Sequence, residues 1–403
     1  MEGLTSEERA VLDSAAAAPM LEQVEAWAPI NSGSRNLSGL ARMAAIYADA
    51  FAALPGELAL KEPAPVEALA SDGTLRSLEH GENLHLRVRP GAPVQLLFTG
   101  HMDTVFGADH PFQSIFWRSE GVLGGPGVAD MKGGIAVLLA ALKAVESSPL
   151  AANLGYEVVI NSDEEVGSPG SAALIAEAAR AKKAALTYEP AALPDGTLAG
   201  ARPGSGNFSL HVTGRSAHAG RNPEDGRNAL LAAAALSLRL AEAKSPGLSV
   251  NPAKIDGGSP NNVVPDYAIL RINMRPASPV DEARAQAAID SAVAEIAAAH
   301  DVSIHVHGGF GRPPKPLDAK AEALFSLVKR CGADLGQQIG WRATGGVCDG
   351  NNIAACGVPV VDTMGVRGGA IHSADEYLCT DSLVERAQLS ALTILRLAAG
   401  EEL

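Results

Sequence analysis

Strand-like apolar runs alternate with helical stretches over the first half of this chain, and this alternation most constrains its fold. Val94–Gly100 and Tyr156–Ser162 are short apolar runs that predict buried strands. Ile135–Val145 and Ser168–Lys182 are longer and rich in alanine, leucine and isoleucine, which predicts helices. Strands and helices at this spacing predict an α/β sheet with crossover helices.

The pattern changes near Gly200 and returns from Pro313, which predicts a second domain inserted into the first. The inserted order, strand–helix–strand–strand–helix–strand, is that of a ferredoxin-like, split βαβ domain. Its predicted strands are Asn207–Gly214, Ser249–Gly257, Tyr267–Arg275 and Val302–His307, and its helices Asn228–Ala243 and Asp281–His300. Outside it we expect helices within Ser6–Ala53 (broken at Pro29–Arg35), Ala319–Cys331 and Thr380–Ala399, and a strand at Val358–Thr363. We therefore expect an α/β domain in two parts, 1–202 and 313–403, around an α+β domain at 203–312.

The formal net charge of the 403-residue chain is −14, from 32 basic and 46 acidic residues. No nucleic-acid partner is expected, because phosphate binding needs a basic surface. The sequence shows no signal-peptide pattern and no apolar run near the roughly 18 residues of a membrane span, so we expect a cytoplasmic protein without membrane contact. The cysteines are expected to be buried thiols because their spacing suits neither a disulfide framework nor zinc; they are Cys331, Cys348, Cys356 and Cys379.

Candidate metal ligands follow the predicted strands, where open α/β sheets usually carry their functional sites. His101 and Asp103 follow Val94–Gly100, and residues two apart in an extended segment face the same way. A carboxylate beside an imidazole can fix the ring tautomer for metal binding. Asp130 lies in a glycine-rich loop before a helix, where it can either approach a metal or cap that helix.

Three further segments offer ligands at the ends of strands. The acids Asp163–Glu165 follow Tyr156–Ser162, and they repel one another unless a positive charge lies there; solvated loop acids are the alternative. Glu189 ends another short apolar run, and His372 follows Val358–Thr363. Each position is ordinary when it is considered alone.

Together these loops offer imidazoles and carboxylates without a thiolate, which suits zinc or a neighbouring metal in a catalytic site. Two divalent ions carry four positive charges, against three negative charges from Asp130, Glu165 and Glu189. A bridging hydroxide balances the remainder, and the two ions can polarise a carbonyl from opposite sides. The residues therefore predict a two-metal hydrolytic site with His101 and His372 as its imidazole ligands.

The ordered motifs resemble the co-catalytic two-zinc metallopeptidases that include glutamate carboxypeptidase, aminoacylase, acetylornithine deacetylase and succinyl-diaminopimelate desuccinylase. The similar segments are Thr99–Val105, Gly125–Gly134, Ser162–Ser168, Ser216–Gly220 and Asn261–Pro265. The resemblance implies a catalytic α/β domain with a central mixed sheet flanked by helices, and an inserted ferredoxin-like lid through which subunits dimerise. It also implies two Zn²⁺ per subunit, with Co²⁺ or Mn²⁺ as possible substitutes.

The resemblance also implies roles for individual residues. Asp130 would bridge the metals; His101 and Glu189 would complete the shell of one ion, and Glu165 and His372 the shell of the other. Asp103 would orient His101. Glu164 would be the general base that takes a proton from water and returns it to the leaving amine.

Two residues of the inserted domain acquire a role only through the resemblance. His218 would reach across a homodimer and stabilise the oxyanion in the partner subunit's active site. Asn262 would contact the substrate or the oxyanion in the same way. The residues alone predict an ordinary surface turn around His218.

Substrate recognition has three further candidates. Alternation places Arg271, Asn273 and Arg275 on one strand face, where Arg275 can clamp a carboxylate, although a solvated face is the alternative. Arg312 and the glycine-rich loop containing Gly346 are the other candidates. The segment ending at Arg275 resembles the carboxypeptidase branch of the family, which implies release of a C-terminal amino acid, with glutamate one candidate. A deacylase or desuccinylase acting on small molecules, and an inactive binding protein, are the alternatives.

Overall fold

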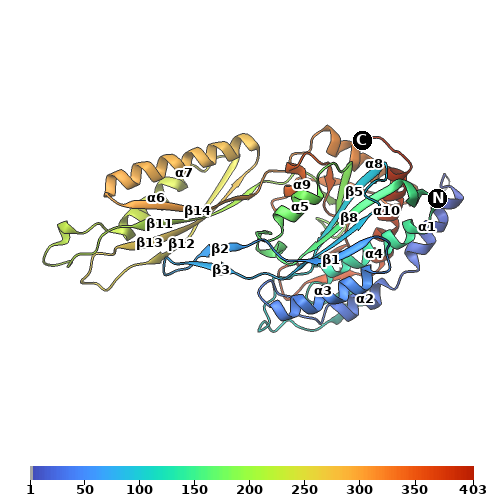
Figure 1. The fold of residues 1–403 in the computed structure, drawn as a ribbon, viewed down its shortest axis with the longest axis horizontal. Helices are drawn as coiled ribbons and strands as arrows, with labels where there is room; N and C mark the ends of the chain where they lie inside the picture. The colour runs from blue at the N-terminus through green and yellow to red at the C-terminus, as the bar shows by residue number, and fades with distance from the viewer. Residues whose placement is uncertain (1–2) are drawn as a thin grey trace.

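The computed structural model describes residues 3–403, which form two domains along one long axis (Figure 1). The larger α/β domain holds both ends of the chain, and the smaller α+β domain, the lid, lies at the other end. The helices of the larger domain are α1 (Ser6–Ala16), α2 (Met20–Trp27), α3 (Leu37–Phe51), α4 (Gly133–Glu146), α5 (Ala172–Ala178), α8 (Ala319–Asp334), α9 (Asp349–Ala355) and α10 (Asp381–Ala398). Its main strands are β1 (Glu57–Lys61), β4 (Asn83–Val88), β5 (Val94–His101), β8 (Leu154–Asn161), β9 (Ala184–Thr187) and β16 (Val360–Val361).

These six strands form a mixed sheet in the order β1-β4-β8-β5-β9-β16. The last four are mutually parallel, whereas β1 and β4 pair antiparallel at one edge. Parallel neighbours need crossover connections, which α4 supplies between β5 and β8, and α5 between β8 and β9. The carboxyl ends of β5, β8 and β9 therefore share one edge of the sheet, and their following loops meet there.

Both faces of the central sheet are covered by helices. Leu96 and Phe98 of β5 pack with residues of α3, α4 and α10, whereas Leu97 packs with residues of α5 and α9. Because successive side chains of a strand point to opposite faces, a strand buried on both sides must be apolar throughout. Each buried side chain of this kind stabilises the fold by about 1.5–3 kcal/mol.

The lid contains four antiparallel strands and two helices. These are β11 (Ser205–Thr213), α6 (Ala229–Ala241), β12 (Leu248–Gly257), β13 (Tyr267–Pro276), α7 (Pro279–His300) and β14 (Ser303–Arg312). The sheet order is β12-β13-β11-β14, and α6 and α7 cover one face, where Leu210 packs with Leu236 and Ile289. The other face is polar because the alternate residues of β11 and β13 are hydrophilic.

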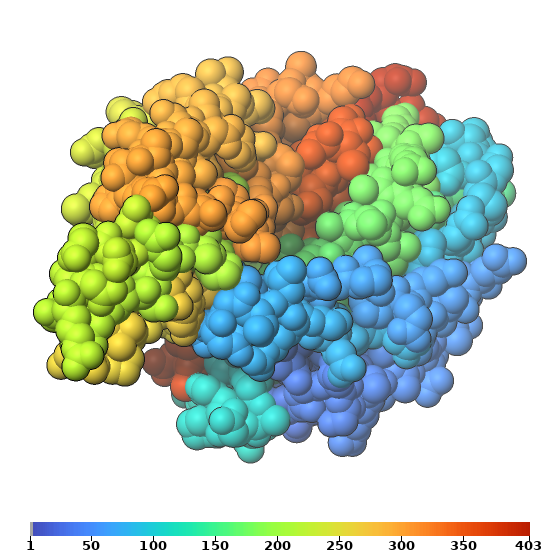
Figure 2. Space-filling view, turned by 60° about the vertical axis from the view of Figure 1, so that its left-hand side comes forward, coloured from blue at the N-terminus to red at the C-terminus, as the bar shows by residue number. Residues whose placement is uncertain are grey.

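A hairpin of the larger domain lies against the lid. Strands β2 (Val66–Leu69) and β3 (Leu75–Leu78) form this arm, which extends toward the lid in Figure 1 and lies beside it, in blue, in Figure 2. Arg271 Nη2 of β13 donates to the Leu69 carbonyl at 2.9 Å. Gly73 at the tip has no side chain, and a Cβ there would lie 3.2 Å from His211 Nε2.

The two chain segments that connect the domains are joined to each other. Arg202 and Lys315 exchange backbone hydrogen bonds of 2.9 and 3.0 Å. Both side chains reach buried Asp362: Arg202 bonds both of its oxygens, at 2.8 and 3.0 Å, and Lys315 Nζ lies 2.8 Å from Oδ2. The base of the lid is therefore fixed to the strand that follows α9.

Short elements complete the structure. An antiparallel sheet contains β6 (Phe116–Ser119), β7 (Val122–Gly124), β17 (Gly368–Gly369) and β18 (Tyr377–Cys379), and a parallel pair contains β10 (Leu198–Ala199) and β15 (Trp341–Arg342). Single helical turns are η1 (Val128–Lys132), η2 (Pro149–Asn153), η3 (Glu164–Val166) and η4 (Pro223–Asp225). None of the helices in residues 3–403 combines the length and hydropathy that a membrane crossing requires.

The predicted fold class is confirmed, because a mixed, helix-flanked sheet is accompanied by a separate strand–helix–strand–strand–helix–strand unit. The predicted helix Ser168–Lys182 is too long: only α5 forms, since Asp163 binds Gly170 N and Ser171 Oγ and holds the preceding residues in a loop. The predicted strand Val358–Thr363 is shorter in the structure: Val360–Val361 pair with β9, and Thr363 forms an isolated antiparallel bridge with Tyr188. The domain boundaries at 202 and 312 stay predictions.

The cysteines agree with the prediction in part. All four are free thiols, so no disulfide framework is present, and Cys331 and Cys348 are buried. Cys379 is partly buried, whereas Cys356 is exposed, which contradicts the prediction of a buried thiol. Cys356 is the residue after α9, and its neighbours Ala355 and Gly357 are exposed as well, so this turn lies at the surface.

Candidate metal centre

The predicted metal ligands gather around Asp130 at the carboxyl edge of the central sheet. His101 ends β5, Glu165 lies in the turn after β8, and Glu189 follows β9. His101 Nε2 lies 3.1 Å from Asp130 Oδ1, and His372 Nε2 lies 3.3 Å from Asp130 Oδ2. The two oxygens of Asp130 thus face two different imidazoles, an arrangement in which one carboxylate can serve two ions.

The carboxylates of Glu189 and Glu165 each lie beside one of the two imidazoles. Glu189 Oε2 lies 3.8 Å from His101 Nε2, and Glu165 Oε2 lies 3.1 Å from His372 Nε2. The ligand atoms of His101, Asp130 and Glu165 all lie within 4.8 Å of one another. The structure therefore brings all five predicted ligands into one cluster.

Asp103 contacts both the His101 ring and the turn that carries Glu164 and Glu165. The backbone carbonyl of Asp103 lies 2.9 Å from His101 Nδ1, so Nδ1 donates and Nε2 is left free to face the cluster. The Asp103 carboxylate, 3.4 Å from Nδ1, accepts hydrogen bonds from Ser34 Oγ and from the backbone N–H groups of Glu164 and Glu165. Asp103 thus positions both the imidazole and the acidic turn.

Glu376 fixes the loop that carries Asp130. Its buried carboxylate accepts hydrogen bonds from the backbone N–H groups of Gly127, Ala129 and Asp130 at 3.0–3.1 Å. The Asp130 side chain makes no capping bond to α4, so the helix-cap alternative is wrong. His372 adopts a left-handed backbone conformation (φ +62°), which is uncommon for residues other than glycine, and its ring lies against Asp130.

The electrostatics of the cluster favour positive charge. Burial, with the charge of Asp130 beside it, raises the pKa of Glu165 to about 7 and also raises the pKa of Glu189. Hydrogen bonds to Asp130 and Glu165 raise the pKa of His372 to about 11. Three buried acids and two imidazoles, without a thiolate, are the donor set that suits two divalent transition-metal ions. The residues present therefore fit the two-metal site.

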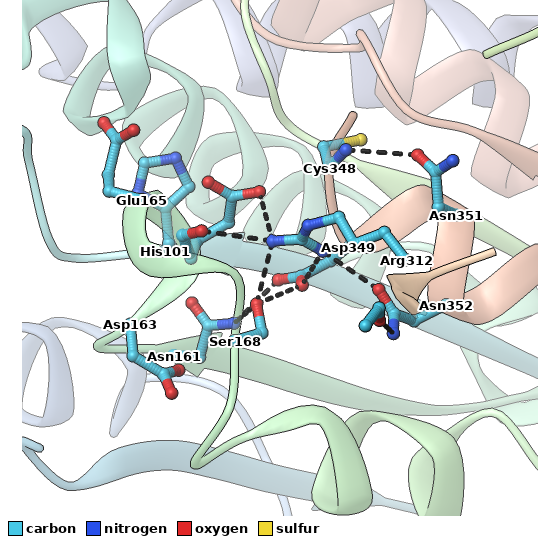
Figure 3. A network of polar contacts seen from close by, with 12 residues as sticks. His101, Asn161, Asp163, Glu165, Ser168, Arg312, Cys348, Asp349, Asn351 and Asn352 are labelled. Atoms are coloured by element: carbon cyan, nitrogen blue, oxygen red, sulfur yellow. Dashed lines mark hydrogen bonds and ion pairs between the residues drawn. The ribbon is translucent and has the colours of Figure 1, made fainter. Parts of the chain in front are cut away.

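Glu164 has different surroundings from its neighbour Glu165. Its Oε1 lies 2.7 Å from Arg312 Nη2, which also bonds Ser168 Oγ at 3.0 Å. The other side of the Arg312 guanidinium donates to Asp349 Oδ1 at 2.8 Å and to Asn352. Figure 3 shows Arg312 at the centre of this network. A residue predicted to bind substrate is thus buried among protein acceptors.

Two cavities meet at the cluster. The inner pocket, about 290 Å³, lies in the larger domain against Glu189, Pro190 and Arg202. The lid cleft, about 870 Å³, lies between the cluster and the polar face of the lid, with Arg275 in its wall. They share five lining residues, namely Glu164, Glu165, Gly346, Val347 and His372.

The substrate candidate Arg275 has no acidic partner among the described residues. Its Nε donates to Asn273 Oδ1 and its Nη1 to the Gly345 carbonyl, both at 3.0 Å. These bonds aim a charged guanidinium into the lid cleft. Gly346 lies beside it, and its carbonyl accepts from Arg202 Nη1 at 3.2 Å.

His218 and Asn262 are not brought to the cluster of their own chain. His218 lies in the loop between β11 and α6, and Asn262 lies in the loop between β12 and β13. Both loops are at the end of the lid away from the larger domain (Figure 1), and Ala219 N donates to the Asn262 carbonyl at 2.9 Å. The His218 side chain is exposed, and neither residue lines the inner pocket or the lid cleft.

Several residues that build the site were not predicted from the sequence. They are Ser34, Arg202, Asp349, Asp362 and Glu376, all buried and all bonded to site residues or to the lid connections. A signal for Glu376 was present in the sequence, because Glu376 follows His372 by four residues in the same loop. The others are isolated polar residues in apolar or mixed surroundings, which no spacing rule selects.

The fold and the cluster define a class of protein, the metal-dependent hydrolases that bind two ions at the carboxyl edge of an α/β sheet. The chain belongs to peptidase family M20/M25/M40, whose model matches residues 97–396. Carboxypeptidase G2 from Pseudomonas sp. (strain RS-16) is 32% identical over 331 residues, covering 80% of this chain and 78% of that protein.

Two further relatives support the assignment. A succinyl-diaminopimelate desuccinylase from Psychrobacter arcticus is 29% identical over 339 residues, covering 77% of this chain and 80% of that protein. The crystal structure of a dinuclear metal-binding M20 peptidase from Bacillus subtilis has the same fold, with a TM-score of 0.65 and 14% identity, over 98% of this chain and 100% of that one.

Proposed function

We propose that this protein is a zinc-dependent amidohydrolase that removes a C-terminal amino acid from a short peptide or an N-acyl amino acid. The observation that carries this proposal is the position of Asp130 between His101 and His372, with Glu164 beside the same cluster. The similarity to carboxypeptidase G2 favours a carboxypeptidase among the activities of the family.

Each residue of the cluster has a part in this reaction. His101, Asp130, Glu165, Glu189 and His372 would hold two zinc ions, which would supply Lewis acidity toward the scissile carbonyl and the attacking water. Glu164 takes the proton of that water and delivers it to the leaving amine nitrogen. Arg312 holds the Glu164 carboxylate at 2.7 Å and so fixes its direction during both transfers.

The lid supplies recognition. The unpaired guanidinium of Arg275 binds the free α-carboxylate of the substrate, which places the scissile bond at the cluster. We further propose that Arg312 and Gly346 shape the same cleft, and that the protein is a homodimer in which His218 and Asn262 complete the partner subunit's site. The exposed positions of both loops support this arrangement.

A deacylase that acts on small N-acyl metabolites is the second candidate, favoured by the similarity to succinyl-diaminopimelate desuccinylase. Side-by-side assays of dipeptides and N-acyl amino acids, each as α-carboxylate and as α-carboxamide, separate the two candidates. We expect zinc to restore activity after chelation and the carboxamides to react far more slowly. Metal content below about one zinc per chain, without recovery on adding zinc, would instead indicate a binding protein.

A further inference from the structure

The two cavities that meet at the metal centre differ in chemistry. The lid cleft presents the uncompensated guanidinium of Arg275 together with amide side chains. The inner pocket is lined mainly by small side chains without charge, among them Pro190, Ala191, Ala192, Ala199, Val347 and Thr363. A substrate whose amide bond lies at the cluster must place one half in each cavity.

Away from the metal centre, the inner pocket offers no free cation to an acidic group. Among the described residues, its cationic lining consists of Arg202 and the candidate ligand His372. Arg202 directs Nε and Nη2 to Asp362 at 2.8 and 3.0 Å, and Nη1 to Thr344 and the Gly346 carbonyl. Its charge is therefore used to hold the lid connections together.

Acidic side chains also face this space. Glu189 lines the inner pocket and not the lid cleft, whereas Glu164 lines both, so neither acid offers a counter-ion to a second carboxylate of the substrate. A buried carboxylate without a counter-ion is strongly disfavoured. Charge thus sets the orientation of the substrate, with the α-carboxylate at Arg275 and the other half in the inner pocket.

We infer that the inner pocket holds the acyl half of the substrate and selects a short, uncharged acyl group over an acidic one such as succinyl. This inference rests on the proposed function, since it assumes an amide substrate bound across the cluster. The lining of one pocket carries the inference, since the inner pocket has a volume of about 290 Å³ and its arginine, Arg202, is already paired with Asp362.

Binding measurements can test the inference apart from turnover. We would titrate zinc-loaded Glu164→Gln protein with N-butanoyl-glutamate and N-succinyl-glutamate in a calorimeter, since these ligands differ mainly by one terminal carboxylate. We expect the succinyl compound to bind at least about tenfold more weakly. Equal or tighter binding of the succinyl compound would overturn the inference.

A pair of variants locates the effect. Ala192→Lys places a cation in the inner pocket, and Ala192→Met adds comparable length without charge. We expect Ala192→Lys, in the Glu164→Gln background, to shift the ratio of the two dissociation constants at least about tenfold toward the succinyl compound, and Ala192→Met to leave it unchanged. An unchanged ratio in Ala192→Lys would show that the acyl group lies elsewhere. Failure of the wild-type protein to hydrolyse any amide would refute the proposed function. It would leave the result for the inner pocket unaffected, because the ratio of the two dissociation constants is measured without turnover.

Discussion

Glu164 and Glu165 are adjacent in the chain, yet their carboxylates do different things. Glu165 Oε2 faces His372 at 3.1 Å, whereas Glu164 Oε1 faces Arg312 at 2.7 Å. Their backbone N–H groups both donate to the Asp103 carboxylate, so one acid fixes the orientation of the whole turn. A carboxylate held by a guanidinium beside the cluster is suited to proton transfer, and one against an imidazole is suited to metal binding.

Glu164→Gln separates these two roles. We expect the variant to keep its zinc content, because the five ligands are intact, and to lose about 10²–10⁴-fold in kcat, the usual contribution of a general base. Elemental analysis and steady-state kinetics measure the two quantities. Glu177→Gln on α5 is the matched control, and near-normal turnover of Glu164→Gln would exclude Glu164 as the base.

Arg275 is expected to act on substrate affinity. Removal of the guanidinium in Arg275→Ala should lower kcat/KM about 10–100-fold for a substrate with a free α-carboxylate, as expected for loss of a charged hydrogen bond. The same change should have little effect on the α-carboxamide of that substrate. Arg284→Ala, at an exposed arginine on α7, controls for the loss of a lid charge. Equal losses on both substrates would contradict the carboxylate clamp.

At the scale of the elements, strands β5 and β8 were predictable because each is a continuous apolar run, and the lid was predictable because its strands and helices each show a period of apolar residues. Strands β1 to β3 were not, because they are short, largely exposed or half-buried and of mixed polarity, and β4 was not, because its buried residues include the polar Asn83 and His85. The metal cluster was predictable because its acids and histidines follow strand ends. Arg202 and Asp362 were not, since they are 160 residues apart and their pairing follows from tertiary packing alone.

Asp362 joins the two connections of the lid, so its loss should destabilise the chain. Burial raises the pKa of Asp362, but the charges of Arg202 and Lys315 outweigh burial and lower it from 3.8 to about 2. Asp362→Asn leaves two buried cations without their acid, which should cost about 3–5 kcal/mol in the free energy of unfolding at pH 7. Asp301→Asn, at an exposed ion pair, should cost less than about 1 kcal/mol.

The same residue predicts a pH dependence. A depressed pKa contributes stability that is fully present above the unfolded value of 3.8 and is lost as pH falls toward about 2. The difference in unfolding free energy between wild type and Asp362→Asn should therefore shrink by about 2 kcal/mol between pH 5 and pH 2.5. Urea titrations across this range measure it, and a constant difference would argue against an ionised Asp362.

The β2–β3 arm is a third link between the domains. Replacing Val66–Leu78 by Gly-Ser-Gly removes the Leu69 carbonyl from Arg271 and the hairpin tip from His211. We expect a wider distribution of lid positions, seen as a larger radius of gyration in solution scattering, with unchanged helix content. Arg76→Ala, on the exposed face of the arm, should behave as wild type. Identical scattering from the shortened chain would show that the two remaining connections fix the lid alone.

At the scale of the whole molecule, the lid carries the features of an association surface. Leu231 and Leu238 of α6 are 61% and 72% exposed and lie on one helical stripe. Two exposed leucines seven residues apart favour contact with a second apolar surface. A two-fold dimer through the lid would move the loops of His218 and Asn262 toward a partner subunit's cluster, since they do not reach their own.

Subunit mixing tests this arrangement. Glu164→Gln and His218→Ala should each be nearly inactive alone, because every site then lacks one group. A hybrid dimer has one site with an intact Glu164 from one subunit and an intact His218 from the other, so random mixing should restore about a quarter of the wild-type sites. Kinetic assay after unfolding and refolding the mixture measures this recovery. Adding Leu231→Glu and Leu238→Glu to both chains should abolish the recovery by preventing dimerisation. Two results would contradict this arrangement. Activity could recover even in the chains that carry Leu231→Glu and Leu238→Glu, or it could fail to recover in mixtures without those substitutions. Either result would show that His218 does not act in the partner subunit's site.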